Sequence, residues 1–289
     1  MHSHDQLYRF VFEDIGVRGE WVQLDASWKA ILERYHYPES VGAQLGQAIA
    51  ATLLLSATIK FDGSLILQSQ SQGPLSTLVA QATHQRTVRG LARWKGDVPA
   101  GTLPEVFGPG QIAITITNHN KERYQGIVAL EGDNLSQALE GYFKNSEQLA
   151  SRFWLAADNS RAAGLFLQEL PNDAHDKEDW NRLETLASTV TDNELLSLSA
   201  TELLHRLFHE EQVRLFDPEP VAFRCTCSHT RIEDTIRAMG YTEVLSIVAE
   251  QGGVQADCEF CNKQYRFDPV DIEQLFAQDI PVSSSNAQH

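Results

Sequence analysis

The chain has 289 residues, of which 42% are hydrophobic and 21% charged, as is ordinary for a soluble globular protein. Its net charge of −16 at pH 7 is uneven: residues 1–171 have a balance of −3 and residues 172–289 a balance of −13. Nucleic-acid binding needs a basic surface that displaces counterions, so the acidic C-terminal part argues against it. The length leaves room for one sizeable core and a smaller second domain.

Residues 40–59 carry no charged side chain and have to be weighed as a membrane span. The stretch contains two glutamines, two glycines and several hydroxyl side chains, which is too polar for hydrocarbon, so we expect a buried core helix. The chain opens with Met-His-Ser-His-Asp and has no basic and apolar leader there. All four cysteines lie in one C-terminal cluster, which suits a reducing compartment. We therefore expect a cytoplasmic protein with no membrane partner.

Residues 1–171 predict an α+β domain of largely antiparallel sheets with interposed helices. Alternation at period two indicates a strand pair over 6–24, followed by a helix that Asp25 or Ser27 caps and that runs to about residue 35. After the core helix, the expected elements are strands within 64–94, a hairpin within 111–130, a helix over 135–148, and strands near 153–156 and 163–170.

Residues 172–223 change character and predict a helical linker that is both charged and amphipathic. A polar, acidic start leads to one helical pattern from Trp180, and a second helix begins near Ser199 or Thr201. The apolar positions of this second helix are Leu203, Leu204, Leu207 and Phe208. Its histidines, His205 and His209, lack a carboxylate partner and are expected to be surface residues rather than metal ligands.

Residues 224–278 contain all four cysteines, as Cys225-x-Cys227 and Cys258-x-x-Cys261. Four thiolates close a tetrahedral zinc site, so the pattern predicts one Zn²⁺ per chain, although C-x-C is less common than C-x-x-C in such sites. The site could be permanently structural. Alternatively, it could be a redox sensor whose thiolates stay reduced until an oxidant joins them into local disulfides. The pattern leaves both interpretations open.

The rest of this domain predicts three helices and a strand. A capping box at Thr230 and Glu233 is expected to open a helix that ends at Gly240, and Thr242 a second helix that ends at Gly252. A strand follows the second cysteine pair at 264–267. Asp268 is the expected N-cap of a helix to about residue 277, and residues 279–289 are expected to form a disordered tail.

Sequence motifs of common enzyme classes are absent. The chain has no Walker loop, no G-x-S-x-G elbow and no G-x-G-x-x-G after a strand, so we expect no enzyme. A thiol oxidoreductase remains an alternative, but its C-x-x-C opens a helix, whereas Cys258 and Cys261 are expected on a knuckle. A constitutive zinc-stabilised interaction domain is the other alternative.

The sequence around the cysteines resembles the redox-regulated 33 kDa chaperonins of the heat-shock class. The resemblance is carried by residues 204–211 (LHRLFHEE), 213–216 (VRLF), 223–228 (FRCTCS), 124–130 (YQGIVAL), 142–148 (YFKNSEQ) and 162–171 (AAGLFLQELP). It covers nearly the whole chain, including the Cys-x-x-Cys about thirty residues after the first pair.

This resemblance implies an ATP-independent holdase of the oxidative stress response, inactive while reduced and zinc-bound. Oxidation is then expected to form the sequence-local disulfides Cys225–Cys227 and Cys258–Cys261 and to release zinc. The metastable linker would loosen, and apolar positions such as Leu203, Leu204, Leu207 and Phe208 would hold unfolding client proteins. Homodimerisation of the oxidised form is a further expectation from the resemblance.

Overall fold

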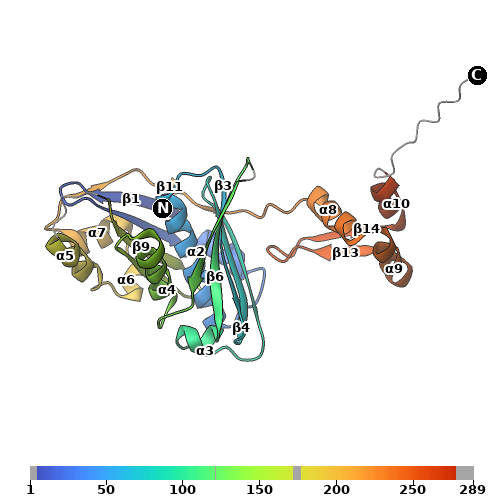
Figure 1. Ribbon diagram of the computed structural model, residues 1–289, viewed down its shortest axis with the longest axis horizontal. Coiled ribbons are helices and arrows are strands. Elements are labelled where there is room, and N and C mark those ends of the chain that lie inside the picture. Colours follow the sequence, from blue (N-terminus) through green and yellow to red (C-terminus); the bar gives the residue numbers. More distant parts are fainter. Residues whose placement is uncertain (1–4, 121, 172–176, 278–289) are drawn as a thin grey trace, which may run out of the picture. The chain divides into compact units, whose positions relative to one another are not determined.

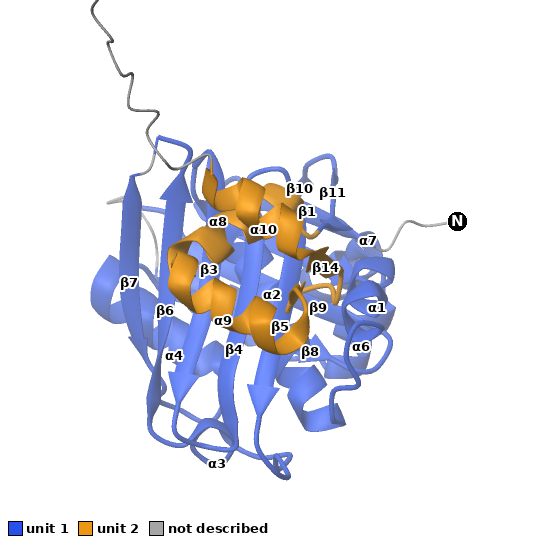
Figure 2. Cartoon of the chain, turned by 90° about the vertical axis from the view of Figure 1, so that its right-hand side faces the viewer, with its two compact units in different colours: residues 1–224 blue, residues 225–289 orange. Residues whose placement is uncertain are grey.

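The computed structural model describes residues 5–120, 122–171 and 177–277. The chain divides into two compact units, residues 1–224 and 225–289, each of which is considered by itself (Figure 2). The helices and strands of residues 177–223 belong to the first of these units. Residues 172–176 of the predicted linker and the predicted tail at 279–289 lie outside the described residues.

The first sheet of unit 1 is antiparallel, with strand order β10-β1-β2-β9-β8 and with β11 also paired to β1. Its strands are β1 (Gln6–Phe12), β2 (Val17–Leu24), β8 (Ser151–Ala157), β9 (Ala162–Glu169), β10 (Val213–Leu215) and β11 (Glu219–Pro220). The predicted strand pair over 6–24 is therefore confirmed. Strands β2 and β9 bury nearly every residue, because both faces of this sheet are covered.

The second sheet has the strand order β12-β5-β4-β3-β6-β7, and its face is turned toward the viewer in Figure 2. Its strands are β3 (Gly63–Ser71), β4 (Leu75–Thr83), β5 (Thr87–Trp94), β6 (Gly110–Asn118), β7 (Arg123–Ala129) and β12 (Ala222–Phe223). Only β12, paired with β5, runs parallel to its neighbour among these described strands. Burial alternates along β3 and β4, as expected where one face of a sheet meets the core.

Helix α2 (Glu39–Thr58) lies between the two sheets and forms the centre of the main core (Figure 1). It is long and apolar enough to cross a membrane, but 72% of an apolar 18-residue stretch within it is buried inside the fold. A Cβ atom at Gly46 would come within 2.5 Å of the Ala157 Cβ, so a small residue is required for this close approach. The predicted core helix is confirmed, and its apolar composition on all sides follows from contact with two sheets.

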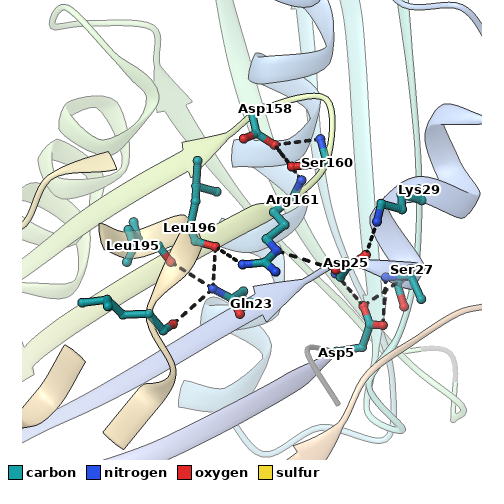
Figure 3. Close-up of polar contacts among 12 residues, drawn as sticks. Asp5, Gln23, Asp25, Ser27, Lys29, Asp158, Ser160, Arg161, Leu195 and Leu196 are labelled. Carbon is teal, nitrogen blue, oxygen red and sulfur yellow. Dashed lines mark hydrogen bonds and ion pairs between the residues drawn. The ribbon is translucent and has the colours of Figure 1, made fainter. Parts of the chain in front are cut away.

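Three shorter helical elements flank this core: α1 (Ala26–Leu32), α3 (Leu103–Phe107) and α4 (Leu135–Tyr142), which continues as a π-helical turn over Phe143–Glu147. The prediction that the side chain of Asp25 or Ser27 caps α1 is wrong, because neither makes the cap hydrogen bond. Asp25 occupies the N-cap position, but the Asp5 carboxylate accepts hydrogen bonds from the backbone N–H groups of Asp25, Ala26 and Ser27 (Figure 3). A cap supplied from 20 residues away leaves no local sequence signal.

Helices α5 (Lys177–Ala187), α6 (Asp192–Ser197) and α7 (Ala200–Phe208) cover the face of the first sheet opposite α2. Successive side chains of β2 point to opposite faces of this sheet: Trp21 contacts these helices, and Val22 contacts the main core. Ser199, one of the two predicted starts of α7, is its N-cap and forms a capping box with Glu202. Helix α6, which the sequence did not predict, begins with a similar box at Thr191 and Glu194.

Residues 213–224, here called the edge segment, follow α7 and pair with the edges of both sheets. Strands β10 and β11 lie along β1, and β12 lies along β5. Glu219 binds Arg9 at 2.8 Å and Arg86 at 2.7 Å, and Arg86 in turn donates to the Ser56 carbonyl at the end of α2. These contacts connect the edge segment to β1, to the β4–β5 turn and to the core helix.

Unit 2 contains α8 (His229–Met239), α9 (Tyr241–Gln251), β13 (Val254–Asp257), β14 (Gln264–Phe267) and α10 (Pro269–Ala277). Two predicted caps are wrong: the N-cap of α8 is Ser228, two residues before the predicted Thr230, and α9 begins after Gly240 with Thr242 already inside its first turn. The predicted cap of α10 is confirmed, because the Asp268 carboxylate accepts from the Asp271 amide at 2.8 Å.

The buried Glu20 on β2 leads to a prediction of how the folding stability depends on pH. Its side chain is 2% exposed, one carboxylate oxygen has no hydrogen-bond partner in the described structure, and burial raises its pKa to about 7 despite the nearby Arg18, Arg9 and Arg86. Because this folded pKa exceeds the unfolded value of about 4.3, ionisation costs stability as pH rises from about 4.3 to 7. We expect Glu20→Gln to remove that cost, on the order of 3 kcal/mol at pH 8.

The measurement is urea unfolding of the wild type and the Glu20→Gln variant at about pH 4 and pH 8, with the exposed Glu122→Gln as the matched control. The stabilisation is expected at pH 8 and not at pH 4. Destabilisation that is larger at pH 8 than at pH 4 would show instead that the ionised Glu20 carboxylate is a stabilising ion-pair partner.

Candidate metal centre

The first cysteine pair lies in the extended stretch between β12 and α8. Ser228, directly after Cys227, accepts a hydrogen bond from the Arg231 amide and so begins α8. The Arg231 guanidinium reaches back to the Thr226 carbonyl at 2.9 Å and to its hydroxyl at 2.7 Å. The single residue between the two cysteines is thus held from the first turn of the helix, which fixes the direction of both thiols.

The second pair lies on the tight turn between β13 and β14. The Cys258 carbonyl accepts from the amides of Cys261 and Asn262, and the Cys258 amide donates to the Lys263 carbonyl. Asn262 takes a left-handed backbone conformation, with φ of 56°, which asparagine tolerates better than most residues. Backbone amides of this turn also donate to the sulfurs of Cys258 and Cys261 and favour their ionised form.

All four sulfur atoms lie within 4.8 Å of one another. The Cys225 and Cys258 sulfurs are 3.6 Å apart, and those of Cys227 and Cys261 are 3.5 Å apart. Four sulfurs bound tetrahedrally to one zinc ion would lie about 3.8 Å from each other. The donor set and its spacing therefore fit a metal ion such as Zn²⁺, which the four cysteines could hold without further ligands.

Tyr265 is the neighbour of this site that the sequence analysis missed. Its hydroxyl donates a hydrogen bond to the Cys227 sulfur at 3.1 Å, and its ring is buried. Burial opposes ionisation of Cys227, but the hydrogen bonds from Tyr265 and the other three thiols outweigh it and lower the pKa of Cys227 to about 7. The only sequence signal for Tyr265 is its inward position in the alternating pattern of β14.

The thiols of the second pair have raised pKa values, in contrast to the lowered pKa of Cys227. Burial raises the pKa of Cys258 and, together with hydrogen bonds to Cys227 and Cys225, raises that of Cys261 to about 12. Without a bound ion, the site therefore combines the readily ionised thiol of Cys227 with thiols at Cys258 and Cys261 whose raised pKa values keep them protonated at neutral pH. Because thiolates are the metal ligands, binding an ion must release the remaining protons.

The core of unit 2 is built around these cysteines. Its buried residues within the described part are Ile236, Val244, Val254, Cys258, Tyr265, Phe267, Ile272 and Leu275, with the other three cysteines packed against them. A core of this size supplies little stability by itself. Metal binding to a four-thiolate site supplies on the order of 10 kcal/mol, which becomes folding free energy for such a unit.

The other predicted site residues lie elsewhere. Leu203, Leu204, Leu207 and Phe208 are buried in unit 1, where they pack against the first sheet. His205 and His209 are exposed on the outer side of α7, with ring centroids 6.1 Å apart, and are not part of the cysteine site.

Fold and site together define an α+β protein with antiparallel sheets and a separate small unit that carries four clustered thiols. The family model described as "Hsp33 protein" matches residues 5–268 of this chain. The chain therefore belongs to the Hsp33 family of chaperones.

Individual relatives agree with this assignment. The chain is 61% identical to the 33 kDa chaperonin of Nitrosococcus oceani over 289 residues, with 100% of both chains covered. It is 46% identical to the 33 kDa chaperonin of Shewanella loihica over 275 residues, covering 95% of this chain and 96% of the relative. The crystal structure of the 33 kDa chaperonin (heat shock protein 33 homolog) from Thermotoga maritima has the same fold. Its TM-score is 0.84 at 20% identity, covering 96% of this chain and 99% of that one.

The four-sulfur site generates a second prediction. We expect Cys258→Ser to reduce bound zinc well below one ion per chain and to make residues 225–277 sensitive to protease even in reductant, because three thiolates bind zinc far more weakly than four. Zinc content is measured with a chromogenic chelator after thiol modification. Tyr265→Phe, which retains all four sulfurs, is the control and should keep one zinc. Full zinc and normal protease resistance in Cys258→Ser would contradict the four-sulfur site.

Proposed function

We propose that this chain is a redox-regulated, ATP-independent holdase chaperone that is inactive while its four cysteines are reduced and hold one Zn²⁺. The observation that carries the proposal is the cluster of four thiols in a unit whose described core is eight residues. Family membership supports the chaperone role, and the relatives named above are called chaperonins. Destroying the ligand set removes most of the stability of such a unit, which makes it suitable as a switch.

Oxidation is the proposed trigger. A thiolate attacks a two-electron oxidant such as hydrogen peroxide to give a sulfenic acid, and a second thiolate displaces hydroxide from it to form a disulfide. Two equivalents of peroxide thus take four electrons from the four sulfurs, and four hydroxide ions leave. The proposed products are Cys225–Cys227 and Cys258–Cys261, which no longer offer thiolates to the metal. The low pKa of Cys227 supports it as the first nucleophile.

The chain path supports a coupling from this trigger to unit 1. Cys225 follows the last hydrogen bond of the edge segment directly, because the Arg224 amide donates to the Val88 carbonyl. Strands β11 and β12 are two residues long each, so the end of this segment is held by short ladders. We infer that unfolding of unit 2 frees the end of the edge segment and lowers the cost of releasing α5–α7. Residues 172–223 would then act as a metastable linker.

Release of these helices would uncover two apolar surfaces at once. One is the inner side of α7, which consists of Leu203, Leu204, Leu207 and Phe208. The other is the face of the first sheet on which they pack, and its buried residues include Phe10, Phe12, Trp21, Leu165 and Leu167. We propose both as the client-binding surface for unfolding proteins. Burial of these side chains, at roughly 1.5–3 kcal/mol each, also explains why the reduced protein keeps them covered.

Further parts of the proposal concern partners and compartment. The net charge of −16 would keep the opened protein soluble with a client attached. A homodimer of the oxidised form is included as an expectation from the family resemblance. A cytoplasmic location is expected from the cysteine usage, and the lack of enzymatic turnover from the absence of enzyme motifs. A thiol oxidoreductase would instead reduce many substrate disulfides per chain.

The experiment that tests this function follows zinc release and holding activity in the same samples. The protein is treated with peroxide at mildly elevated temperature, zinc is detected with a chromogenic chelator, and aggregation of a heat-denatured client is measured by light scattering. We expect zinc release to track a gain in holding activity, and reductant with zinc to reverse both. Equal holding activity in the reduced protein, or zinc release without any gain, would contradict the redox switch.

A variant of unit 1 tests the proposed release of α5–α7. The buried Gln23 amide donates to the carbonyls of Leu195, Leu196 and Leu198, at 2.8–3.3 Å, and so holds α6 and the start of α7 on the sheet (Figure 3). Gln23→Ala removes the donor to the Leu195 and Leu198 carbonyls, while the Leu196 carbonyl still accepts from the Arg161 guanidinium at 2.8 Å, and we expect a cost of about 1–3 kcal/mol. We expect partial holding activity without oxidant.

The readouts are client aggregation in reductant and limited proteolysis within residues 177–212. The control is Gln125→Ala, whose side chain is exposed on β7. Unchanged protease sensitivity with full dependence on oxidant would show that release of these helices does not limit activation. Loss of the whole cooperative transition of unit 1 would identify a general folding defect instead.

A further inference from the structure

A second group of metal-type ligands lies in unit 1, at one end of the second sheet. Asp62 comes directly before β3, His84 directly after β4, and His119 directly after β6. Because β3 pairs with both β4 and β6, these three positions meet at the same end of the sheet. One carboxylate oxygen and one nitrogen from each ring all lie within 4.8 Å of one another.

The distances within this group are those of a coordination shell. The Asp62 Oδ1 atom is 3.3 Å from His84 Nε2 and 3.2 Å from His119 Nδ1. His119 Nδ1 also donates to the Asp62 carbonyl oxygen at 2.8 Å, and an ion at this nitrogen would replace that hydrogen bond. Nitrogen and oxygen ligands at 2.0–2.1 Å from a tetrahedral ion lie about 3.3 Å apart. The two imidazole rings meet edge to face, with centroids 5.7 Å apart, so neither blocks the space that an ion would fill.

Backbone contacts hold the three residues in these positions. The His119 amide donates to the Asp62 carbonyl at 2.8 Å, the His84 amide donates to the Gly63 carbonyl at 3.1 Å, and the Asp62 amide donates to Asn118 Oδ1. A Cβ atom at Gly63 would lie 1.9 Å from the Thr117 carbonyl oxygen, so only glycine allows β3 to begin this close to β6. The site is therefore built by a packed sheet end.

His84 also has the outer contact that a metal-bound imidazole requires. Its Nδ1 atom lies 3.3 Å from the Gly63 carbonyl oxygen, which can accept the proton of Nδ1 when Nε2 binds a metal. In the absence of a metal, the Gly63 amide donates to the same Nδ1 atom at 3.1 Å, which leaves the proton on Nε2. Metal binding at Nε2 would move the ring proton to Nδ1 and would end this hydrogen bond from the Gly63 amide. A carbonyl partner of this kind orients ligating histidines in metal sites.

We propose that Asp62, His84 and His119 bind a divalent transition-metal ion of the zinc class. Two imidazoles and one carboxylate are a common ligand set for Zn²⁺, Co²⁺ and Ni²⁺, with the remaining positions filled by water. The exposed fractions of the side chains, 74% for Asp62, 69% for His119 and 31% for His84, give an ion and its waters access. The set contains no thiol, so it binds metal independently of the cysteine state.

The test uses the full-length reduced protein, first loaded with one equivalent of Zn²⁺ at the cysteines. His2 and His4 are replaced by serine in every sample, because terminal imidazoles also bind metals. Co²⁺ is then titrated and followed by its visible absorption and by calorimetry. Binding at an oxygen and nitrogen site gives weak visible bands, whereas entry into the cysteine site gives strong sulfur-to-cobalt charge transfer in the near ultraviolet.

We expect one equivalent of Co²⁺ to bind without charge-transfer absorption, and His84→Ala and Asp62→Asn each to weaken this binding about tenfold or more. His205→Ala, on the exposed histidine pair of α7, is the matched control and should bind as the parent does. Unchanged binding in His84→Ala and Asp62→Asn, or loss only in His205→Ala, would overturn the proposal. Absence of any thiol-free Co²⁺ binding would show that the three side chains form only a surface ion pair.

Discussion

The convergence of four sulfur atoms is the constraint on which unit 2 depends. Its described core contains eight buried residues, and one of these is itself a cysteine of the site. Apolar burial on this scale gives little net stability once chain entropy is subtracted. The ligands come from the first residues of the unit and from the β13–β14 turn, so a metal bound between them would join the start of α8 to that turn. A reaction at the cysteine sulfurs would therefore also change the folding stability of unit 2.

The stability of unit 1 has a different source, because its main core around α2 is apolar and contains none of the ligand residues. The helices α5–α7 and the edge segment are added to this core at the outer face and edges of the sheets. They are held by apolar contacts and by a few polar contacts, among them Gln23 with the α6 carbonyls and Glu219 with Arg9 and Arg86. We propose that this outer layer is released while α2 and the strands packed against it remain folded.

The two ligand groups differ in the way their geometry is maintained. The cysteines lie in a unit with a small core, and their convergence helps to hold that unit together. Asp62, His84 and His119 lie at the end of an extensive sheet whose backbone hydrogen bonds set their positions without any ion. Oxidation converts thiolates to disulfides, and only the first group contains them. A protein that loses one metal site under oxidant would thus retain another whose donors are nitrogen and oxygen.

The sequence by itself determined the α+β class, most strands, the core helix and the approach of the four cysteines, because periodicity and ligand spacing are local properties. It also placed the cap at Asp268, whose partner lies three residues away, and narrowed the start of α7 to Ser199 or Thr201. Only the tertiary structure decided features that join distant residues: the Asp5 cap of α1, the Tyr265 hydrogen bond to Cys227, and the meeting of Asp62, His84 and His119. Strand pairing brings these groups together, and no local pattern in the chain encodes which strand ends will be neighbours.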